Sequence, residues 1–424
     1  MAESSDDNVG LVKSVDQVDR LNAEFYAKFP YPWSISMFEV IDDPRFWQDF
    51  LCQEIADWDR NLFAAEQPRV WVAGCGTNQA VITALRFPKA TVVGSDLSAR
   101  SLEITAQNAK LLGISNLELR QESLNESSYA DEFDYVICTG VIHHNADPVF
   151  TLAKLTGALK RHGILELMVY NRYHSMATVP FQKAVQILAG GAGQPDLDTQ
   201  VQLARALVAE LKMDNLSAGA LSVSSVSEIS DSQFADLLVQ PVWRSYTVES
   251  LEELCSSAGL TIVAPCVNQF DAARECYRWS MRFVDERLKT AYESLPDTRK
   301  WQISNLMNRE NSPMLWFYVQ RADSDRPIKS ERQITNEFLD RSARAVKVKK
   351  LLRLKNDDGS FSDREVVFPR ASRDARAKAI LEKLDSSVPL RTVFERAGVD
   401  TDFDTANSLR LQLTTSMFPF LKVL

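Results

Sequence analysis

The chain has 424 residues, of which 45% are hydrophobic and 25% are charged, a balance typical of globular proteins with two or three domains. Its net charge of -9 repels the phosphate backbone of nucleic acid, which disfavours nucleic acid as the default partner. The six cysteines form no Cys-x-x-Cys pair and no zinc-type spacing with histidine, so we expect no metal site.

The N-terminal part of the chain begins with residues 1–7, which are acidic and lack the basic and apolar regions of a signal peptide. No apolar run is long enough to cross a bilayer, so we expect a cytoplasmic protein that makes no membrane contact. Disorder is expected before residue 14. Residues 15–29 form a predicted amphipathic helix that ends at Pro30-Tyr31-Pro32, and a second helical stretch is predicted over residues 44–63.

From residue 69 the pattern changes to strands that alternate with helices. The predicted strands cover residues 70–73, 90–94, 117–120, 133–138 and 163–170, and the predicted helices cover residues 79–87, 99–112 and 148–159. This alternation predicts βαβ units and a parallel sheet with both faces covered by helices.

A helical insertion over residues 171–245 interrupts this alternation after the fifth strand. It contains a glycine-rich break at residues 190–195 and a small-residue, serine-rich stretch near residues 217–227. The α/β pattern then resumes with a helix over residues 248–258 and two strands over residues 260–266 and 314–319.

The C-terminal part, residues 329–424, follows a polar linker at residues 322–327. A β-hairpin is predicted around Asn356-Asp357-Asp358-Gly359, and three helices are predicted over residues 373–384, 390–397 and 405–415. The mixture indicates a small α+β, winged-helix-like domain. Residues 341–376 hold eleven lysines or arginines and five acidic residues, which favours either a solvated face or contact with nucleic acid.

The strand over residues 70–73 runs into Gly74-Cys75-Gly76 and a helix. Glycines let the backbone turn sharply, and the free N–H groups of the helix suit a carboxylate or a pyrophosphate. Asp96 closes the next strand about 20 residues later, where a carboxylate can bind both ribose hydroxyls or simply cap a helix. Gln79 is bulky where dinucleotide sites have a third glycine, which disfavours NAD.

Five motifs follow one another in order through this part of the chain. They are Val72-Ala-Gly-Cys-Gly-Thr-Asn78, Gly94-Ser-Asp-Leu-Ser98, Phe133-Asp-Tyr135, Gly140-Val-Ile-His-His144 with Asp147-Pro148, and Leu159-Lys-Arg-His-Gly163. Together they resemble class I S-adenosylmethionine-dependent methyltransferases. The upstream segment Phe25 to Trp33 is similar to a Tyr…Pro-Tyr-Pro segment that folds over the cofactor site in a bacterial branch of that family.

This resemblance implies a Rossmann-like α/β fold with a seven-stranded sheet, bound to S-adenosyl-L-methionine. It implies an N-terminal helical cap over the cofactor site (residues 1–68), a methyltransferase domain (residues 69–323) with the insertion as a lid (residues 171–245), and the C-terminal domain (residues 329–424).

Carried over by motif, the resemblance also implies a role for individual residues. Asp96 binds the ribose, Leu97 contacts the adenine near Glu122 and Ser123, and Thr139 lies beside the methionyl and sulfonium groups. The full implied cofactor site is Tyr26, Tyr31, Gly74, Cys75, Gly76, Asn78, Asp96, Leu97, Glu122, Ser123, Thr139 and Gly140. Two departures stand out: Ala73 replaces a common acidic residue, and Asn78 replaces a common third glycine.

Candidates for contact with the methyl acceptor follow strands four and five. His144 lies at the carboxyl edge of the sheet, where open α/β sheets bind ligands. Tyr173 and His174 leave strand five at the same edge, and all three residues could instead have structural roles. The apolar side chains of the insertion either pack as an ordinary core or form a lid over the acceptor pocket; they are Phe234, Leu237, Pro241, Trp243 and Tyr246.

We therefore expect an enzyme that methylates a small molecule, an amino acid or a natural-product intermediate. Methylation of a protein side chain such as lysine is the alternative. An NAD-dependent oxidoreductase and a cofactor-binding regulator with a C-terminal module on nucleic acid are disfavoured by Gln79 and by the acidic charge. A homodimer stays open.

Overall fold

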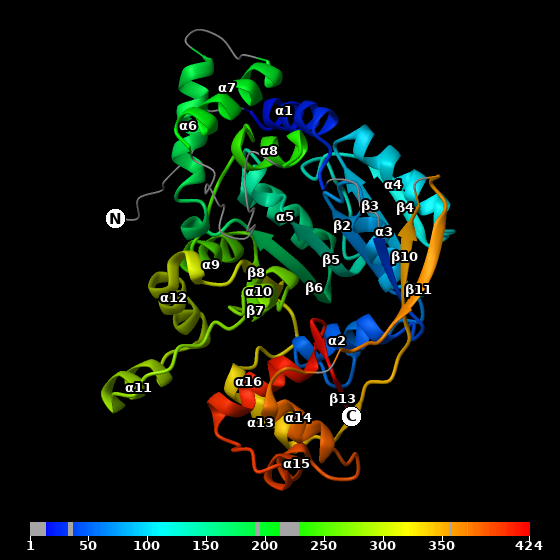
Figure 1. Ribbon diagram of the computed structural model, residues 1–424, viewed down its shortest axis with the longest axis vertical. Coiled ribbons are helices and arrows are strands. Elements are labelled where there is room, and N and C mark those ends of the chain that lie inside the picture. The colour runs from blue at the N-terminus through cyan, green and yellow to red at the C-terminus, as the bar shows by residue number, and fades with distance from the viewer. Residues whose placement is uncertain (1–13, 33–36, 191–195, 213–228, 357, 371) are drawn as a thin grey trace.

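The computed structural model describes residues 14–32, 37–190, 196–212, 229–356, 358–370 and 372–424 (Figure 1). Several parts of the sequence analysis lie outside the described residues. These are the N-terminal residues up to 13, Trp33, Asp357, residues 191–195 of the glycine-rich break, and the serine-rich stretch.

A seven-stranded sheet forms the centre of the molecule. Its strands are β2 (Arg69–Ala73), β3 (Thr91–Asp96), β4 (Leu117–Gln121), β5 (Phe133–Thr139), β6 (Leu159–Val169), β7 (Leu260–Pro265) and β8 (Leu315–Arg321). The spatial order is β4-β3-β2-β5-β6-β8-β7, and all neighbours are parallel except β8, which is antiparallel to both β6 and β7. The predicted Rossmann-like sheet is confirmed.

Helices cover both faces of this sheet. The flanking helices are α3 (Gln79–Arg86) and α4 (Ala99–Leu111) on one face, and α5 (Pro148–Ala158) and α9 (Val248–Ser257) on the other. Helices α10 (Gln269–Ala273), α11 (Glu286–Glu293) and α12 (Asp297–Asn308) connect β7 to β8. In β2, Val72 packs toward α3 and Trp71 toward α5, because successive strand side chains point to opposite faces. The central strands are therefore apolar on both sides.

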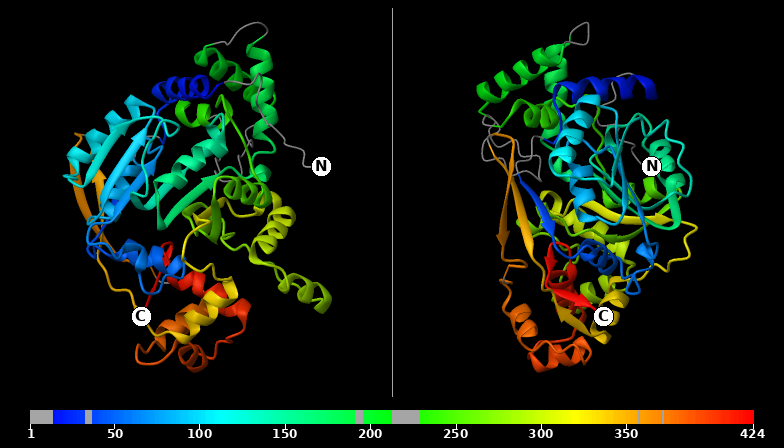
Figure 2. Two further views of the ribbon diagram at one scale, coloured as in Figure 1. Left: turned by 180° about the vertical axis from the view of Figure 1, so that it is seen from behind. Right: turned by 90° about the vertical axis from the view of Figure 1, so that its right-hand side faces the viewer.

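The insertion after β6 packs against the N-terminal helix. It consists of α6 (Thr178–Ala189), α7 (Leu197–Glu210) and α8 (Asp231–Leu238), which gather beside α1 (Val15–Lys28) at one end of the molecule (Figures 1 and 2). Phe25 of α1, Phe181 of α6 and Phe234 of α8 are buried in one shared core. Phe234 and Leu237 thus pack as an ordinary core, and this core holds α1 and the insertion together as a unit.

The sequence analysis predicts a helical segment for residues 1–68. In the structure, the residues between α1 and the sheet also include a strand. Strand β1 (Met37–Ile41) pairs antiparallel with β10 (Lys350–Lys355), which pairs with β11 (Phe361–Val366). Phe38 is buried against Val81 of α3, and its ring lies 5.9 Å from that of Phe361. The C-terminal hairpin therefore lies beside β1 and packs with it over α3 and the end of α4 (Figure 2).

The rest of the C-terminal part is built around a hydrophobic core that Ala56 and Trp58, from the segment after α2, also enter. Its elements are α13 (Glu331–Asp340), β9 (Ala343–Ala345), α14 (Ala375–Glu382), α15 (Leu390–Arg396), α16 (Phe403–Thr414), β12 (Phe418–Pro419) and β13 (Leu421–Val423). Phe338, Phe394 and Leu409 are fully buried in this core. The predicted α+β C-terminal domain is confirmed.

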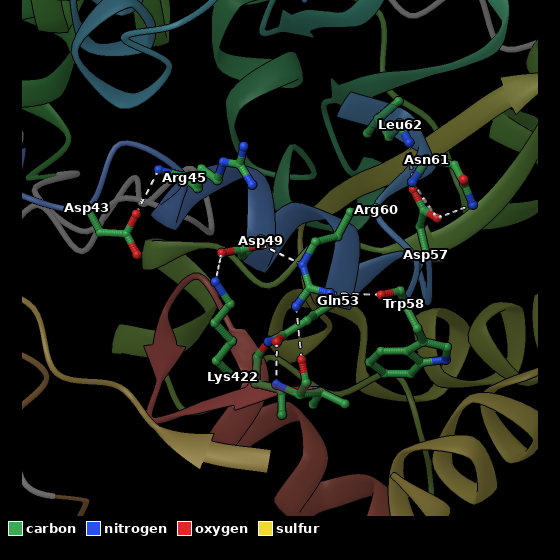
Figure 3. A network of polar contacts seen from close by, with 12 residues as sticks. Asp43, Arg45, Asp49, Gln53, Asp57, Trp58, Arg60, Asn61, Leu62 and Lys422 are labelled. Carbon is green, nitrogen blue, oxygen red and sulfur yellow. Dashed lines mark hydrogen bonds and ion pairs between the residues drawn. The ribbon is translucent and has the colours of Figure 1, made fainter. Parts of the chain in front are cut away.

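Helix α2 (Phe46–Glu54) joins the C-terminal domain to the sheet and does not cover the cofactor site, a second departure from the expected N-terminal cap (Figure 3). The Gln53 amide donates to the carbonyl oxygens of Thr414 and Leu421 at 3.0 and 3.2 Å. Asp49 accepts from Arg60 at 2.6 Å and also contacts Lys422. Gln53 and Asp49 therefore hold α2 against the C-terminal end of the chain, because they bind its buried carbonyl groups and the Lys422 ammonium group.

Candidate cofactor and active site

The glycine turn after β2 needs glycine at two positions. Gly74 and Gly76 have φ values of +73° and +54°, in the left-handed region. A Cβ on Gly74 would lie 2.5 Å from the Cγ2 atom of Val141, and a Cβ on Gly76 would collide with the carbonyl oxygen of Tyr31. The turn is therefore packed between the loop after β5 and the Pro-Tyr-Pro segment.

The upstream segment is held on this turn by hydrogen bonds. The backbone N–H of Thr77 donates to the carbonyl of Tyr31 at 3.1 Å, and the Thr77 hydroxyl donates to the carbonyl of Pro32 at 2.5 Å. Two residues that precede β1 in the chain are thus hydrogen-bonded to a residue that follows it.

Asp96 lies at the end of β3, opposite the turn. Its two carboxylate oxygens accept from the backbone N–H groups of Gly76 and Ser98, each at 2.8 Å. Burial raises the pKa of this carboxyl above its ordinary value. The two backbone bonds fix the side chain, and each oxygen keeps a further lone pair for a ligand hydroxyl.

One cavity at this edge of the sheet collects most of the predicted cofactor residues. Eleven of the twelve line its wall, which is made by Asp19, Asn22, Tyr26, Tyr31, Pro32, Gly74, Cys75, Gly76, Gln79, Asp96, Leu97, Ser101, Glu122, Ser123, Leu124, Thr139, Gly140, Val141, His144 and Asn145. The exception is Asn78, which is fully buried and accepts from the Asn108 amide at 2.9 Å. Asn78 supports the turn from behind, because its side chain points into the protein.

Helix α1 supplies wall residues that the sequence analysis misses. Asp19 accepts from the Ser123 hydroxyl at 2.5 Å, and Asn22 donates to the backbone carbonyl of His144 at 2.8 Å. Asp19, Asn22 and Tyr26 are spaced three and four residues apart, so their side chains lie on one face of the helix. That polar stripe on an amphipathic helix is the signal that could have identified them. Gln79 is also a wall residue, and its amide donates to the Thr139 hydroxyl at 2.7 Å.

His144 lines the cavity from the short 3-10 helix Ile142–His144 that follows β5. Its Nδ1 atom lies 2.6 Å from the carbonyl oxygen of Val242, which only accepts, so Nδ1 carries the hydrogen. Nε2 is left with a lone pair and is buried without a hydrogen-bond partner among the described residues. Burial lowers the pKa of His144 to about 4, so the ring is neutral at pH 7.

A stack of aromatic rings stands behind His144. Tyr170 lies between His143, at 3.6 Å between centroids, and Trp243, at 4.1 Å, with 30° between the ring planes on each side. The ring of Tyr26 meets that of His144 edge-on at 6.5 Å. Trp243 does not line the cavity; its stacking on Tyr170 anchors the segment after α8 behind His144.

Tyr173 and His174 lie outside this cavity, and their expected contact with the methyl acceptor stays a prediction. Neither lines the cavity. His174 donates from Nε2 to the carbonyl of Ser312 at 2.9 Å, and the backbone of Tyr173 donates to Asn171 at 3.1 Å. The amide of Asn171 binds Ser312 and Pro313, which turns the chain toward the start of β8 and away from the site.

Two further features are absent from the described part of the chain. No group of three or more His, Cys, Asp or Glu side chains there is arranged to hold a metal ion. No described helix combines the length and the apolar character needed to cross a membrane.

Comparison with known families agrees with this geometry. Residues 69–193 match a family model described as a methyltransferase domain. With the strand order and the glycine turn, the match defines a class I S-adenosylmethionine-dependent methyltransferase domain. Enzymes of this class use S-adenosylmethionine as the cofactor that supplies the methyl group.

Several known proteins are similar to this chain over part of its length. The uncharacterized protein syc1184_c from Synechococcus sp. is 27% identical over 258 residues, which cover 59% of this chain and 60% of that protein. A tRNA U34 carboxymethyltransferase from Campylobacter jejuni is 29% identical over 191 residues, 42% of this chain and 61% of that enzyme. The chain thus spans about three fifths of the length of these relatives.

A solved structure shares the fold over a longer stretch. PKMT2 from Rickettsia typhi, in complex with AdoHcy, has a TM-score of 0.54 at 16% sequence identity. The match covers 90% of this chain and 76% of the PKMT2 chain. The common fold therefore extends beyond the methyltransferase domain.

Proposed function

We propose that the protein transfers a methyl group from S-adenosylmethionine to a small-molecule, amino-acid or natural-product acceptor. The observation that carries this proposal is the cavity between the glycine turn, Asp96 and helix α1. Because α1 and the Pro-Tyr-Pro segment cover the cavity, it suits a small acceptor better than a broad protein surface. The contacts of Tyr31 and Pro32 with Thr77 also support assignment to the bacterial branch that carries this segment.

The residues present fit the cofactor. Asp96 has lone pairs for the two ribose hydroxyls, and Leu97 offers an apolar face for the adenine beside Glu122 and Ser123. The glycine turn leaves backbone room for the methionyl part near Thr139. The acidic residue often found at the end of the first strand is Ala73 here, so that position offers no carboxylate to the amino group of the cofactor.

Bound S-adenosylmethionine supplies a methyl group on an already activated sulfonium. The protein then has to align the acceptor and exclude water. The free lone pair at Nε2 of His144 can accept a hydrogen bond from the acceptor and orient it. With a pKa of about 4, this imidazole is a weak base at neutral pH, so we assign it the orienting role.

We also propose the domain division and the location. The core around Phe338 and Leu409, most of whose members lie within residues 329–424, supports a C-terminal domain over that range. The core shared by Phe25 and Phe234 supports a lid at residues 171–245. The six cysteines are all free, and five of them are buried, which supports a reducing, cytoplasmic location.

Product analysis tests the proposal. The full chain is incubated with S-adenosylmethionine in three separate assays. One contains a panel of small hydroxyl, thiol and amine compounds, one contains lysine-containing peptides, and one contains unmodified tRNA. S-adenosylhomocysteine is then measured. Turnover confined to small molecules supports the proposal, whereas turnover confined to peptides or tRNA contradicts it.

A further inference from the structure

Asp236 of α8 is a buried carboxylate for which the proposed mechanism has no use. Its exposed fraction is 6%, and the Tyr26 hydroxyl, at 3.4 Å, is the one hydrogen-bond donor to it among the described residues. No described Lys, Arg or His lies within ion-pair distance of it. Because a buried carboxylate without a cation is unfavourable, the position calls for an opposite charge from a ligand.

The charge of this carboxylate acts on three tyrosine hydroxyls, of which that of Tyr26 contacts it directly. Burial, and after it the charge of Asp236, raises the pKa of Tyr26, Tyr31 and Tyr170. The three residues come from α1, from the Pro-Tyr-Pro segment and from the end of β6, so the fold brings separate parts of the chain together here. No described residue makes a hydrogen bond to the Tyr170 hydroxyl, and the Tyr170 ring is fixed between His143 and Trp243.

The cluster adjoins the cofactor cavity. Tyr26 and Tyr31 line that cavity with Gly74 and Asp96, and the Tyr26 hydroxyl also donates to Asp236. The Tyr26 hydroxyl is held by the Gln240 amide, which donates to it at 2.8 Å. A group bound against Asp236 is therefore next to the site proposed for the cofactor.

The geometry points to an amine as the methyl acceptor: Asp236, with the hydroxyl groups of Tyr26, Tyr31 and Tyr170, forms the site for its ammonium group. This inference rests on the proposed methyltransferase function. Carboxylate and hydroxyl oxygens accept hydrogen bonds from an ammonium group, and aromatic rings favour a cation. An alcohol or a thiol would leave the charge of Asp236 unpaired, and an acidic acceptor would be repelled by it.

The reaction balances with Asp236 as the proton acceptor. The ammonium group gives one proton to the Asp236 carboxylate, which frees the nitrogen lone pair. The nitrogen then forms a bond to the methyl carbon, the electron pair of the carbon–sulfur bond stays on sulfur, and the products are an N-methylammonium and the thioether S-adenosylhomocysteine. Burial raises the pKa of Asp236 to about 7, closer to the working pH of a proton acceptor than the value of about 4 for His144.

Calorimetry on the full chain saturated with S-adenosylhomocysteine tests this inference. The probes are n-butylamine, Nα-acetyl-lysine amide and the uncharged n-butanol. We expect at least one of the two amines to bind, and we expect no binding of n-butanol. A preference for n-butylamine identifies a free small amine as the source, and a preference for Nα-acetyl-lysine amide identifies a lysine side chain.

Two variants and one control make the result specific. Asp236→Asn should abolish amine binding and lower amine-dependent turnover by about 10²-fold or more, while the affinity for S-adenosylhomocysteine stays within about twofold. Tyr170→Phe should weaken amine binding by about fivefold. Asp231→Asn changes an exposed carboxylate on the same helix and should change neither quantity.

The outcomes separate this inference from the function on which it rests. Equal binding of n-butylamine and n-butanol, no amine binding at all, or full amine binding by Asp236→Asn would each overturn the amine site. If S-adenosylhomocysteine itself does not bind to the unmodified protein, the proposed function fails first.

Discussion

Replacing Gly76 with alanine tests whether the Pro-Tyr-Pro segment closes the cofactor site. The new Cβ meets the carbonyl of Tyr31, which is backbone and cannot move without the segment. The two hydrogen bonds from Thr77 to Tyr31 and Pro32 are then lost, at about 1 kcal/mol each. The positive φ of +54° adds strain of about 1–2 kcal/mol.

The two effects differ in the quantities that they lower. The strain lowers only the free energy of unfolding, whereas the loss of the docked segment lowers both the free energy of unfolding and the cofactor affinity. About 2 kcal/mol of lost docking corresponds to about 30-fold weaker binding of S-adenosylhomocysteine, measured by calorimetry.

Gly113→Ala is the matched control. Gly113 has a φ of +68°, and nothing lies within 4 Å of an added Cβ, so this variant carries the strain without the collision. It should lose only the about 1–2 kcal/mol of stability that the strain costs, measured in a urea titration, and keep full cofactor affinity. Equal affinity in Gly76→Ala and Gly113→Ala would refute the role given to the segment.

Three further predictions concern single side chains. Asp96→Ala should weaken S-adenosylmethionine binding by about 2–4 kcal/mol, because it removes charged hydrogen bonds to the ribose; calorimetry with less than a fivefold change would exclude that contact. Phe234→Ala should lower the free energy of unfolding by about 3–5 kcal/mol, because Phe234 is fully buried between α1 and the insertion, and chemical denaturation measures this. The folded protein holds His144 neutral, with a pKa of about 4 against about 6.5 when unfolded, so its contribution to stability is complete above pH 6.5 and is lost as the pH falls toward 4. Relative to His144→Asn, the unmodified protein should lose up to about 3 kcal/mol over that range, and parallel stability curves for the two proteins would contradict the burial of a neutral ring.

Much of the methyltransferase domain is predictable because its signals are local. Each strand is a short apolar run followed by a turn motif, and the glycine turn and Asp96 belong to adjacent βα units. Their side chains meet because the carboxyl ends of parallel strands lie at one edge of the sheet. The positions of Gly74, Gly76 and Asp96 follow from this rule.

The departures depend on contacts between distant parts of the chain. Strand β1 is five residues long and is stabilised by β10, more than 300 residues away, so its own sequence carries little signal. Asn78 points inward because Asn108 of α4 binds it. His174 faces Ser312 because Asn171 redirects the chain after β6. Neither partner can be inferred from the local pattern.

The most direct measurement of the central claim is a calorimetric titration of the full chain with S-adenosylmethionine, S-adenosylhomocysteine and NAD in parallel. The glycine turn, Asp96 and the bulky Gln79 predict micromolar binding of both adenosyl ligands and no binding of NAD. Binding of NAD, or no binding of either adenosyl ligand, would contradict the assignment of this cavity as a methyltransferase cofactor site.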